Sequence, residues 1–230
     1  MNAFASFLIT VIILMTFDAF NLPLNAQQHV FFATQDNGRV SAQVYGKGNH
    51  GVILVHGGRF NKESWADQAN VLASKGFLVA AIDLRGYGSS TGPGPSDPYS
   101  APFYQDVLAA VRYLRSTGST TISVIGASMG GWAAADASIH TPGEIDRIVI
   151  LAASVDSPGK LTGRKLFIVA QGDTTASGIP RLVQIRKDFE QAPKPKALVV
   201  LNGTAHAQYI FDSPQSEDLM KELLKFLSEP

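Results

Sequence analysis

The sequence predicts a single α/β domain built on an open, mostly parallel sheet of eight strands with helices on both faces. Short apolar segments alternate along the chain with longer segments of helical periodicity, which is the rhythm of β-α-β units. Most of the short segments are apolar at every position, as in strands that helices bury on both faces. The 230 residues, 45% of them hydrophobic and 17% charged, suffice for one domain with a full core.

The expected elements follow one another in a simple order. The turn signal Asp-Asn-Gly at 36–38 separates two β-rich segments, 29–35 and 39–46, and predicts an antiparallel hairpin at the start of the sheet. The Gly- and Pro-rich segment 91–102 is interpreted as a loop within the domain. Further strands are expected at 51–58, 77–84, 121–128, 145–154, 165–173 and 196–203. Helices are expected at 64–76, 103–118, 131–140, 179–193 and 216–230.

The N-terminal segment, residues 1–26, is predicted to be a secretory signal peptide. It is uncharged over 3–17 and has a small residue, Ala26, before a polar stretch, where cleavage would leave the mature domain 27–230. No Lys or Arg precedes the apolar run, so an uncleaved membrane anchor stays an alternative, although the run is shorter than the ~20 residues of a spanning helix. We expect an exported protein, periplasmic or secreted, in either case.

The charge and cysteine counts exclude several classes of partner. Lys plus Arg and Asp plus Glu number 19 each, so no strong field attracts nucleic acid. With no cysteine, the chain has no disulfide, no thiolate metal site and no cysteine nucleophile. No clustered set of His, Asp and Glu ligands is evident, so we expect no metal and no cofactor. The expected partners are a small-molecule acyl substrate and water.

Ser128 is the candidate nucleophile. The stretch VIGASMGGW, residues 124–132, places Ser128 between Gly126 and Gly130, directly after an expected strand and before an expected helix. A side chain at either glycine would collide with the neighbouring strand or helix, and such a turn lifts the serine hydroxyl above the sheet edge. The alternative is a tight turn without chemistry, because Gly and Ser are common residues.

A serine hydroxyl needs a base and a carboxylate to become a nucleophile. His206 follows the last expected strand, and Asp173 follows the strand before it, so that the chain order is Ser, Asp, His. Asp156, after the expected strand 145–154, is the chief competitor for the carboxylate. In open α/β sheets the ligand site lies at the carboxyl ends of the strands, where all four residues are expected.

Five motifs together resemble the α/β-hydrolase superfamily, from about residue 30 to the end of the chain. They are VHGG at 55–58, DLRGYGSS at 83–90, GASMGG at 126–131, QGD at 171–173 and GTAH at 203–206. The resemblance implies an α/β-hydrolase fold similar to carboxylesterases and dienelactone hydrolases. The segment between the strands 145–154 and 165–173 is too short for the helical lid of many lipases, so no cap domain is expected.

The resemblance also implies roles for single residues: Ser128 is the nucleophile, Asp173 the acid and His206 the base. The backbone N–H groups of Met129 and Gly58 would form the oxyanion hole, with Arg59 the next choice after Gly58. His56 would support the oxyanion loop by hydrogen bonding, and Asp83 and Arg85 are interpreted as residues that hold their loop. Ala207 stands after the histidine where the family often has glycine.

These residues predict a serine hydrolase that cleaves small or medium acyl esters through an acyl-enzyme. An amidase, a thioesterase or a cofactor-free perhydrolase could use the same triad, and the sequence does not separate them. A non-catalytic binding protein on the hydrolase scaffold is the alternative from a different class, since a fold does not determine a function.

Overall fold

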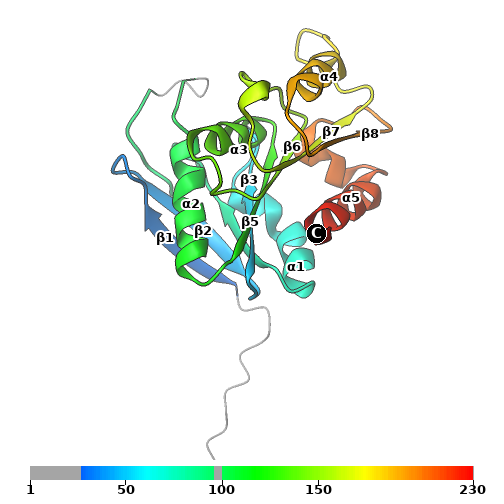
Figure 1. The fold of residues 1–230 in the computed structure, drawn as a ribbon. Coiled ribbons are helices and arrows are strands. Elements are labelled where there is room, and N and C mark those ends of the chain that lie inside the picture. The colour runs from blue at the N-terminus through cyan, green and yellow to red at the C-terminus, as the bar shows by residue number, and fades with distance from the viewer. Residues whose placement is uncertain (1–26, 96–99, 230) are drawn as a thin grey trace, which may run out of the picture.

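The computed structural model describes residues 27–95 and 100–229 (Figure 1). The expected signal peptide, 1–26, lies outside the described residues. Eight strands form one sheet in the order β1-β2-β4-β3-β5-β6-β7-β8, which confirms the predicted fold class. The strands are β1 (Gln28–Ala33), β2 (Arg39–Tyr45), β3 (His50–Val55), β4 (Leu78–Ile82), β5 (Thr121–Ala127), β6 (Arg147–Leu151), β7 (Arg164–Ala170) and β8 (Lys196–Leu201).

The helices connect the strands much as expected. They are α1 (Ala66–Ser74), α2 (Tyr104–Ser116), α3 (Met129–His140), α4 (Arg181–Gln191) and α5 (Ser216–Ser228), with the short 3₁₀ helices η1 (Lys62–Trp65), η2 (Pro158–Lys160) and η3 (Ala207–Asp212). The expected helix 64–76 is divided between η1 and α1. Sequence periodicity did not predict η2 or η3, because 3₁₀ helices of three and six residues are too short to show a period.

The predicted hairpin is present, and it is the antiparallel part of the sheet. β1 pairs with β2, and β2 pairs with β4, both antiparallel, whereas all pairs from β4 to β8 are parallel. After β3 the chain moves outward to β4 and then returns to β5 on the other side of β3. This change of direction creates the switch point at which open α/β sheets bind their ligands. Ser128 follows β5 at this point.

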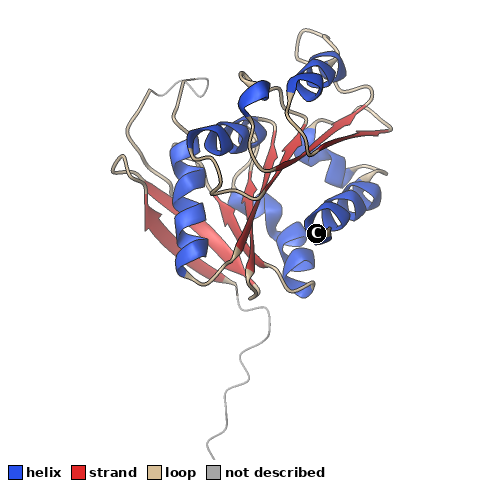
Figure 2. Ribbon diagram, viewed as in Figure 1, coloured by secondary structure: helices blue, strands red, loops and turns tan. Residues whose placement is uncertain are grey.

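Helices cover both faces of the sheet (Figure 2). Ile53 and Val55 of β3 join the apolar cluster under α2, α3 and α4. Val52 and Leu54 of the same strand join the cluster under α1 and α5. All four side chains are fully buried, which explains why the strand is apolar at every position instead of alternating.

No cap domain covers the described part of the sheet edge. Residues 152–163 connect β6 directly to β7, with η2 as their helical turn, as the length of this segment predicted. Across residues 27–95 and 100–229, no helix combines the length and the apolar character that crossing a membrane requires.

The contact of α3 with the sheet depends on two glycines. A methyl group added at Gly126 would lie 2.1 Å from the carbonyl oxygen of Gly130, and one added at Gly130 would lie 2.3 Å from the carbonyl oxygen of Val55. Both distances are far below van der Waals contact, and the opposing atoms belong to the backbone. The glycines therefore allow the start of α3 to lie against β3 and β5.

We expect Gly126→Ala to lower the free energy of unfolding by about 3 kcal/mol or more, because the added methyl group would force α3 away from β5. Gly159→Ala is the matched control, since its methyl group would lie 3.8 Å from the nearest atom, and it should change stability by less than about 0.5 kcal/mol. Urea denaturation followed by circular dichroism measures both. Equal stability of the two variants would contradict this packing.

Candidate active site

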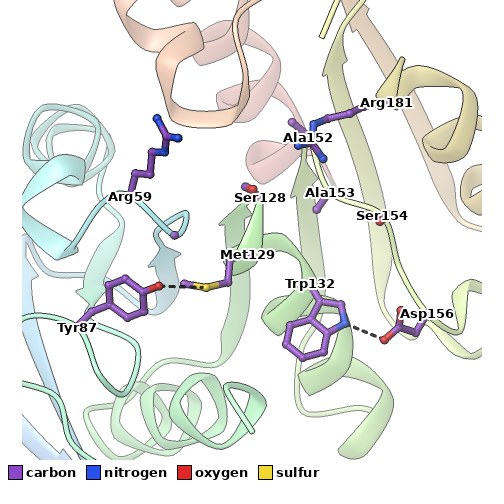
Figure 3. Close-up of a pocket in the computed structure, with 11 residues that line it drawn as sticks. Arg59, Tyr87, Ser128, Met129, Trp132, Ala152, Ala153, Ser154, Asp156 and Arg181 are labelled. Carbon is purple, nitrogen blue, oxygen red and sulfur yellow. Dashed lines mark hydrogen bonds between the residues drawn. The ribbon is translucent and has the colours of Figure 1, made fainter. Parts of the chain in front are cut away.

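Ser128 lies in a strained turn between β5 and α3. Its backbone has φ 50° and ψ −115°, a sparsely populated conformation for a residue other than glycine, which costs about 1–3 kcal/mol. Its N–H donates to the carbonyl of Leu151 at 2.8 Å, and its carbonyl accepts from the N–H of Gly131 at 2.9 Å. The turn is held from both sides, and Ser128 borders the cavity at the edge of the sheet (Figure 3).

The structure brings Ser128, His206 and Asp173 into one chain of hydrogen bonds. Nε2 of His206 lies 2.9 Å from Oγ of Ser128, and Nδ1 of His206 lies 2.8 Å from Oδ2 of Asp173. A carboxylate only accepts, so Nδ1 carries the proton and Nε2 is free to accept the proton of the serine hydroxyl. This arrangement can activate a serine for attack on an electrophilic carbon.

Asp173 is held at the end of β7 by its own loop. Only 1% of its side chain is exposed. Its N–H donates to the carbonyl of Ala170 at 3.1 Å, and its carbonyl accepts from the N–H of Arg181 at 3.0 Å. Nε of Arg181 lies 3.5 Å from Oδ1 of Asp173. The carboxylate therefore has His206 on one oxygen and a guanidinium on the other.

Asp156, the competing carboxylate, lies elsewhere in the same cavity. Its Oδ2 accepts a hydrogen bond from Nε1 of Trp132 at 3.0 Å (Figure 3). Both aspartates follow strands at the carboxyl edge, which is why the sequence could not separate them by position alone. Of the two, Asp173 is the one that contacts His206.

Gly58 and Met129 border the same cavity as Ser128, and each has a backbone N–H group. Neither N–H donates to another group in residues 27–95 and 100–229. Met129 begins α3, where the helix dipole adds positive potential. Two N–H groups in such positions can receive a negative charge that develops on a carbonyl oxygen.

His56 supports this loop, as predicted. It is fully buried; Nδ1 donates to the carbonyl of Gly57 at 2.8 Å, and Nε2 accepts from the N–H of Leu84 at 3.1 Å. Burial lowers the pKa of His56, while the bond to Gly57 opposes this shift. A neutral His56 therefore ties the loop after β3 to the loop after β4.

Gln208 is a supporting residue that sequence reasoning missed. It lies in η3, two residues after His206, and its Oε1 accepts the N–H of Gly57 at 2.7 Å. Its Nε2 donates to Oγ of Ser64 at 2.7 Å. The side chain thus joins the histidine loop to the loop that carries Gly58. No motif in the sequence indicates the contact between Gln208 and Gly57, which lie 151 positions apart.

Buried ion pairs hold the loop after β4, as the interpretation of Asp83 and Arg85 predicted. Asp83 accepts from Nζ of Lys62 at 2.7 Å. Arg85 pairs with Asp106 at 2.7 Å and with Asp36 at 2.6 Å. A backbone hydrogen bond also holds this loop: the N–H of residue 87 donates to the carbonyl of residue 84 at 2.9 Å.

That loop contributes Tyr87 to the cavity wall. The Tyr87 hydroxyl donates to Sδ of Met129 at 3.6 Å (Figure 3), and burial raises the pKa of Tyr87. The cavity has a volume of about 640 Å³, which suits a small or medium ligand. Within the described residues, no three His, Cys, Asp or Glu side chains gather so that they could hold a metal ion.

A second histidine–serine contact lies at the opposite edge of the sheet. Nε2 of His50, at the start of β3, is 2.7 Å from Oγ of Ser123 in β5. No carboxylate hydrogen-bonds His50 within the described residues. Burial, helped by the charge of Arg147, lowers the pKa of His50 to about 4. Neither His50 nor Ser123 borders the cavity, and their contact links the neighbouring strands β3 and β5.

Comparisons with known proteins agree with the fold. A family model described as alpha/beta hydrolase fold matches residues 52–188. The AB hydrolase superfamily protein YisY of Bacillus subtilis is 28% identical over 209 residues, which cover 90% of this chain and 67% of that protein. The human serine hydrolase BPHL is 34% identical over 114 residues, 49% of this chain and 38% of that protein. The chain thus spans well under half of BPHL.

Solved structures resemble the whole domain. The Pyrococcus furiosus esterase Pf2001 superimposes with a TM-score of 0.71 and 18% identity over 89% of this chain and 94% of that chain. An esterase from Exiguobacterium antarcticum gives a TM-score of 0.71 and 15% identity over 88% and 100%. The fold and the cavity define a hydrolase of the α/β type. This chain belongs to the α/β-hydrolase fold family.

The low pKa of His50 predicts a loss of stability in mild acid. His50 is neutral in the folded protein down to about pH 4 but gains a proton near pH 6.5 when unfolded, so its contribution is present above pH 6.5 and is lost as pH falls toward 4. The decrease in unfolding free energy between pH 7.5 and 4.5 should be about 1 kcal/mol smaller in His50→Gln. Urea titrations at pH 7.5 and 4.5 measure this decrease. Equal decreases in the wild type and His50→Gln would refute the low pKa of His50.

Proposed function

We propose that this protein is a serine hydrolase that cleaves small or medium acyl esters. The observation that carries the proposal is the hydrogen-bonded chain from Oγ of Ser128 through His206 to Asp173, with distances of 2.9 and 2.8 Å. The N–H groups of Met129 and Gly58, which have no hydrogen-bond acceptor among residues 27–95 and 100–229, support the same chemistry. Relatives and structural neighbours include a pimeloyl-[acyl-carrier protein] methyl ester esterase of Cronobacter sakazakii, 31% identical over 112 residues, and the esterases above.

Acylation is the first half of the proposed reaction. His206 accepts the proton of the Ser128 hydroxyl while Oγ attacks the ester carbon, and the carbonyl electron pair moves to oxygen. Met129 and Gly58 donate hydrogen bonds to this oxyanion. The carboxylate of Asp173 stabilises the imidazolium and keeps its orientation. The intermediate then expels the alcohol, which takes the proton from Nε2, and an ester of Ser128 remains.

Deacylation repeats these steps with water. His206 accepts a proton from a water molecule as the water oxygen attacks the acyl carbon, and the second oxyanion occupies the same hole. Collapse of this intermediate breaks the bond to Oγ and returns the proton to Ser128. The products are a carboxylic acid and an alcohol, with no other reagent consumed. The uncovered edge of the sheet gives substrate and water direct access.

Ser128→Ala should lower kcat/KM for p-nitrophenyl butyrate by about 10⁴-fold or more, because no other hydroxyl contacts His206 in the described residues. Ser154→Ala is the matched control, since Ser154 borders the same cavity but lies outside the hydrogen-bonded chain, and it should stay within about threefold of the wild type. A fluorophosphonate probe should label the wild type and Ser154→Ala. Labelling of folded Ser128→Ala would refute the assignment of the nucleophile.

The two aspartates can be separated by substitution with asparagine. Asp173→Asn should reduce kcat by about 10²–10⁴-fold, because an amide can orient His206 in the wrong tautomer and cannot stabilise the imidazolium. Asp156→Asn retains an acceptor for the indole of Trp132 and should reduce kcat by less than about fivefold. Steady-state kinetics on p-nitrophenyl butyrate tests both variants. The reverse order of effects would move the carboxylate role to Asp156.

A further inference from the structure

Two arginines border the cavity on opposite sides of Ser128. Arg59 comes from the loop after β3, and Arg181 is the first residue of α4 (Figure 3). The ester chemistry proposed above uses neither side chain to bind or transfer a proton. The chain as a whole has equal numbers of basic and acidic residues, so the pair is a local concentration of positive charge at this cavity.

Arg59 carries a charge with no partner in the described part of the chain. The residue is exposed, and it forms no ion pair or hydrogen bond within residues 27–95 and 100–229. It directly follows Gly58, whose N–H is a proposed oxyanion donor. A ligand carbonyl bound at Gly58 would therefore lie next to the base of this side chain.

Two opposite fields act on Arg181. The N-terminus of α4 carries partial positive charge, which disfavours a basic residue there, whereas the carboxylate of Asp173 lies 3.5 Å from Nε of Arg181 and favours it. This Nε makes no hydrogen bond in the described residues. About 30% of the side chain is exposed. The contact with Asp173 therefore leaves donors of the guanidinium available to a ligand.

The carboxylate that borders the cavity forms no ion pair with Arg59 or Arg181 within the described residues. Asp156 is the carboxylate among the described lining residues, and its Oδ2 already accepts from the indole N–H of Trp132 at 3.0 Å. In Figure 3 this pair lies on the far side of Ser128 from Arg59. The cavity near the candidate nucleophile is therefore open to a ligand with a negative charge.

We propose that the cavity binds esters that carry an anionic group, a carboxylate or a phosphate, in addition to the ester that is cleaved. The guanidinium groups of Arg59 and Arg181 attract that anion from two sides of the cavity, and the planar donor set of each matches carboxylate and phosphate oxygens. This inference rests on the proposed function, because the anion is recognised while the ester carbon is at Ser128. The cavity would then select among acyl esters by their charge.

Matched pairs of esters test the proposal. On the acyl side, mono-p-nitrophenyl glutarate is compared with methyl p-nitrophenyl glutarate, which has the same chain but no charge. On the alcohol side, 4-acetoxybenzoate is compared with its methyl ester. We expect kcat/KM of the wild type to favour the anionic ester about tenfold or more in at least one pair, which is the ratio that one hydrogen bond to a charged group supports.

Substitutions connect this preference to the arginines. Arg59→Gln should reduce the anionic-to-neutral ratio of kcat/KM about fivefold or more in the preferred pair, and added NaCl should reduce the ratio in the wild type as well. Arg181→Gln should also reduce the ratio. Loss of the contact with Asp173 would slow the hydrolysis of both esters equally, so it would leave the ratio unchanged. Arg186→Gln is the control, because Arg186 is an exposed residue of the same helix that does not border the cavity, and the ratio should not change.

The outcomes separate this inference from the function on which it rests. Hydrolysis of both esters in each pair with equal kcat/KM would overturn the anion site and leave the serine hydrolase intact. A preference that Arg59→Gln and Arg181→Gln both retain would also overturn it. If no ester is hydrolysed and no fluorophosphonate label appears on the folded protein, the proposed function fails, and the anion site fails with it.

Discussion

The close approach of the α3 backbone to β3 determines the position of Ser128 and of Met129 beside it. Because Gly130 has no side chain, the first turn of α3 lies against the carbonyl oxygen of Val55 at the end of β3. The chain must then turn sharply at Ser128, which explains its φ of 50°. The same turn places Met129 at the start of α3 and at the border of the cavity. A single backbone contact thus positions the candidate nucleophile, Ser128, together with Met129, the proposed source of one oxyanion donor.

The other groups reach this turn through loops that are tied to one another. Gln208 joins the histidine loop to the loop of Gly58, and His56 joins that loop to the loop after β4. Arg181 lies against Asp173 and also borders the cavity. These ties are hydrogen bonds and ion pairs between short loops on a rigid sheet, so the site needs no cap to hold its geometry.

Local patterns predicted the fold and the three residues at its centre. Apolar runs, the Asp-Asn-Gly turn and the glycines around Ser128 are short-range signals, and the positions of Asp173 and His206 follow from the ends of strands. What the sequence did not reveal depends on contacts between distant positions. Asp173 and Asp156 follow neighbouring strands; the resemblance favoured Asp173, and the fold shows the contact itself, between Asp173 and His206. Gln208 and Arg181 belong to none of the motifs, and for Arg59, which follows the VHGG motif, the resemblance implied only a role of the backbone N–H.

The central claim is that Ser128 becomes acylated during turnover, and mass spectrometry of the acid-quenched protein tests it most directly. A slowly released acyl group, supplied as p-nitrophenyl trimethylacetate, favours accumulation of the intermediate. We expect the intact protein to gain the mass of one trimethylacetyl group. Peptide mapping should place this group on Ser128, and it should disappear as substrate is exhausted. Turnover of this ester without a covalent adduct, or with the adduct on another residue, would contradict the account.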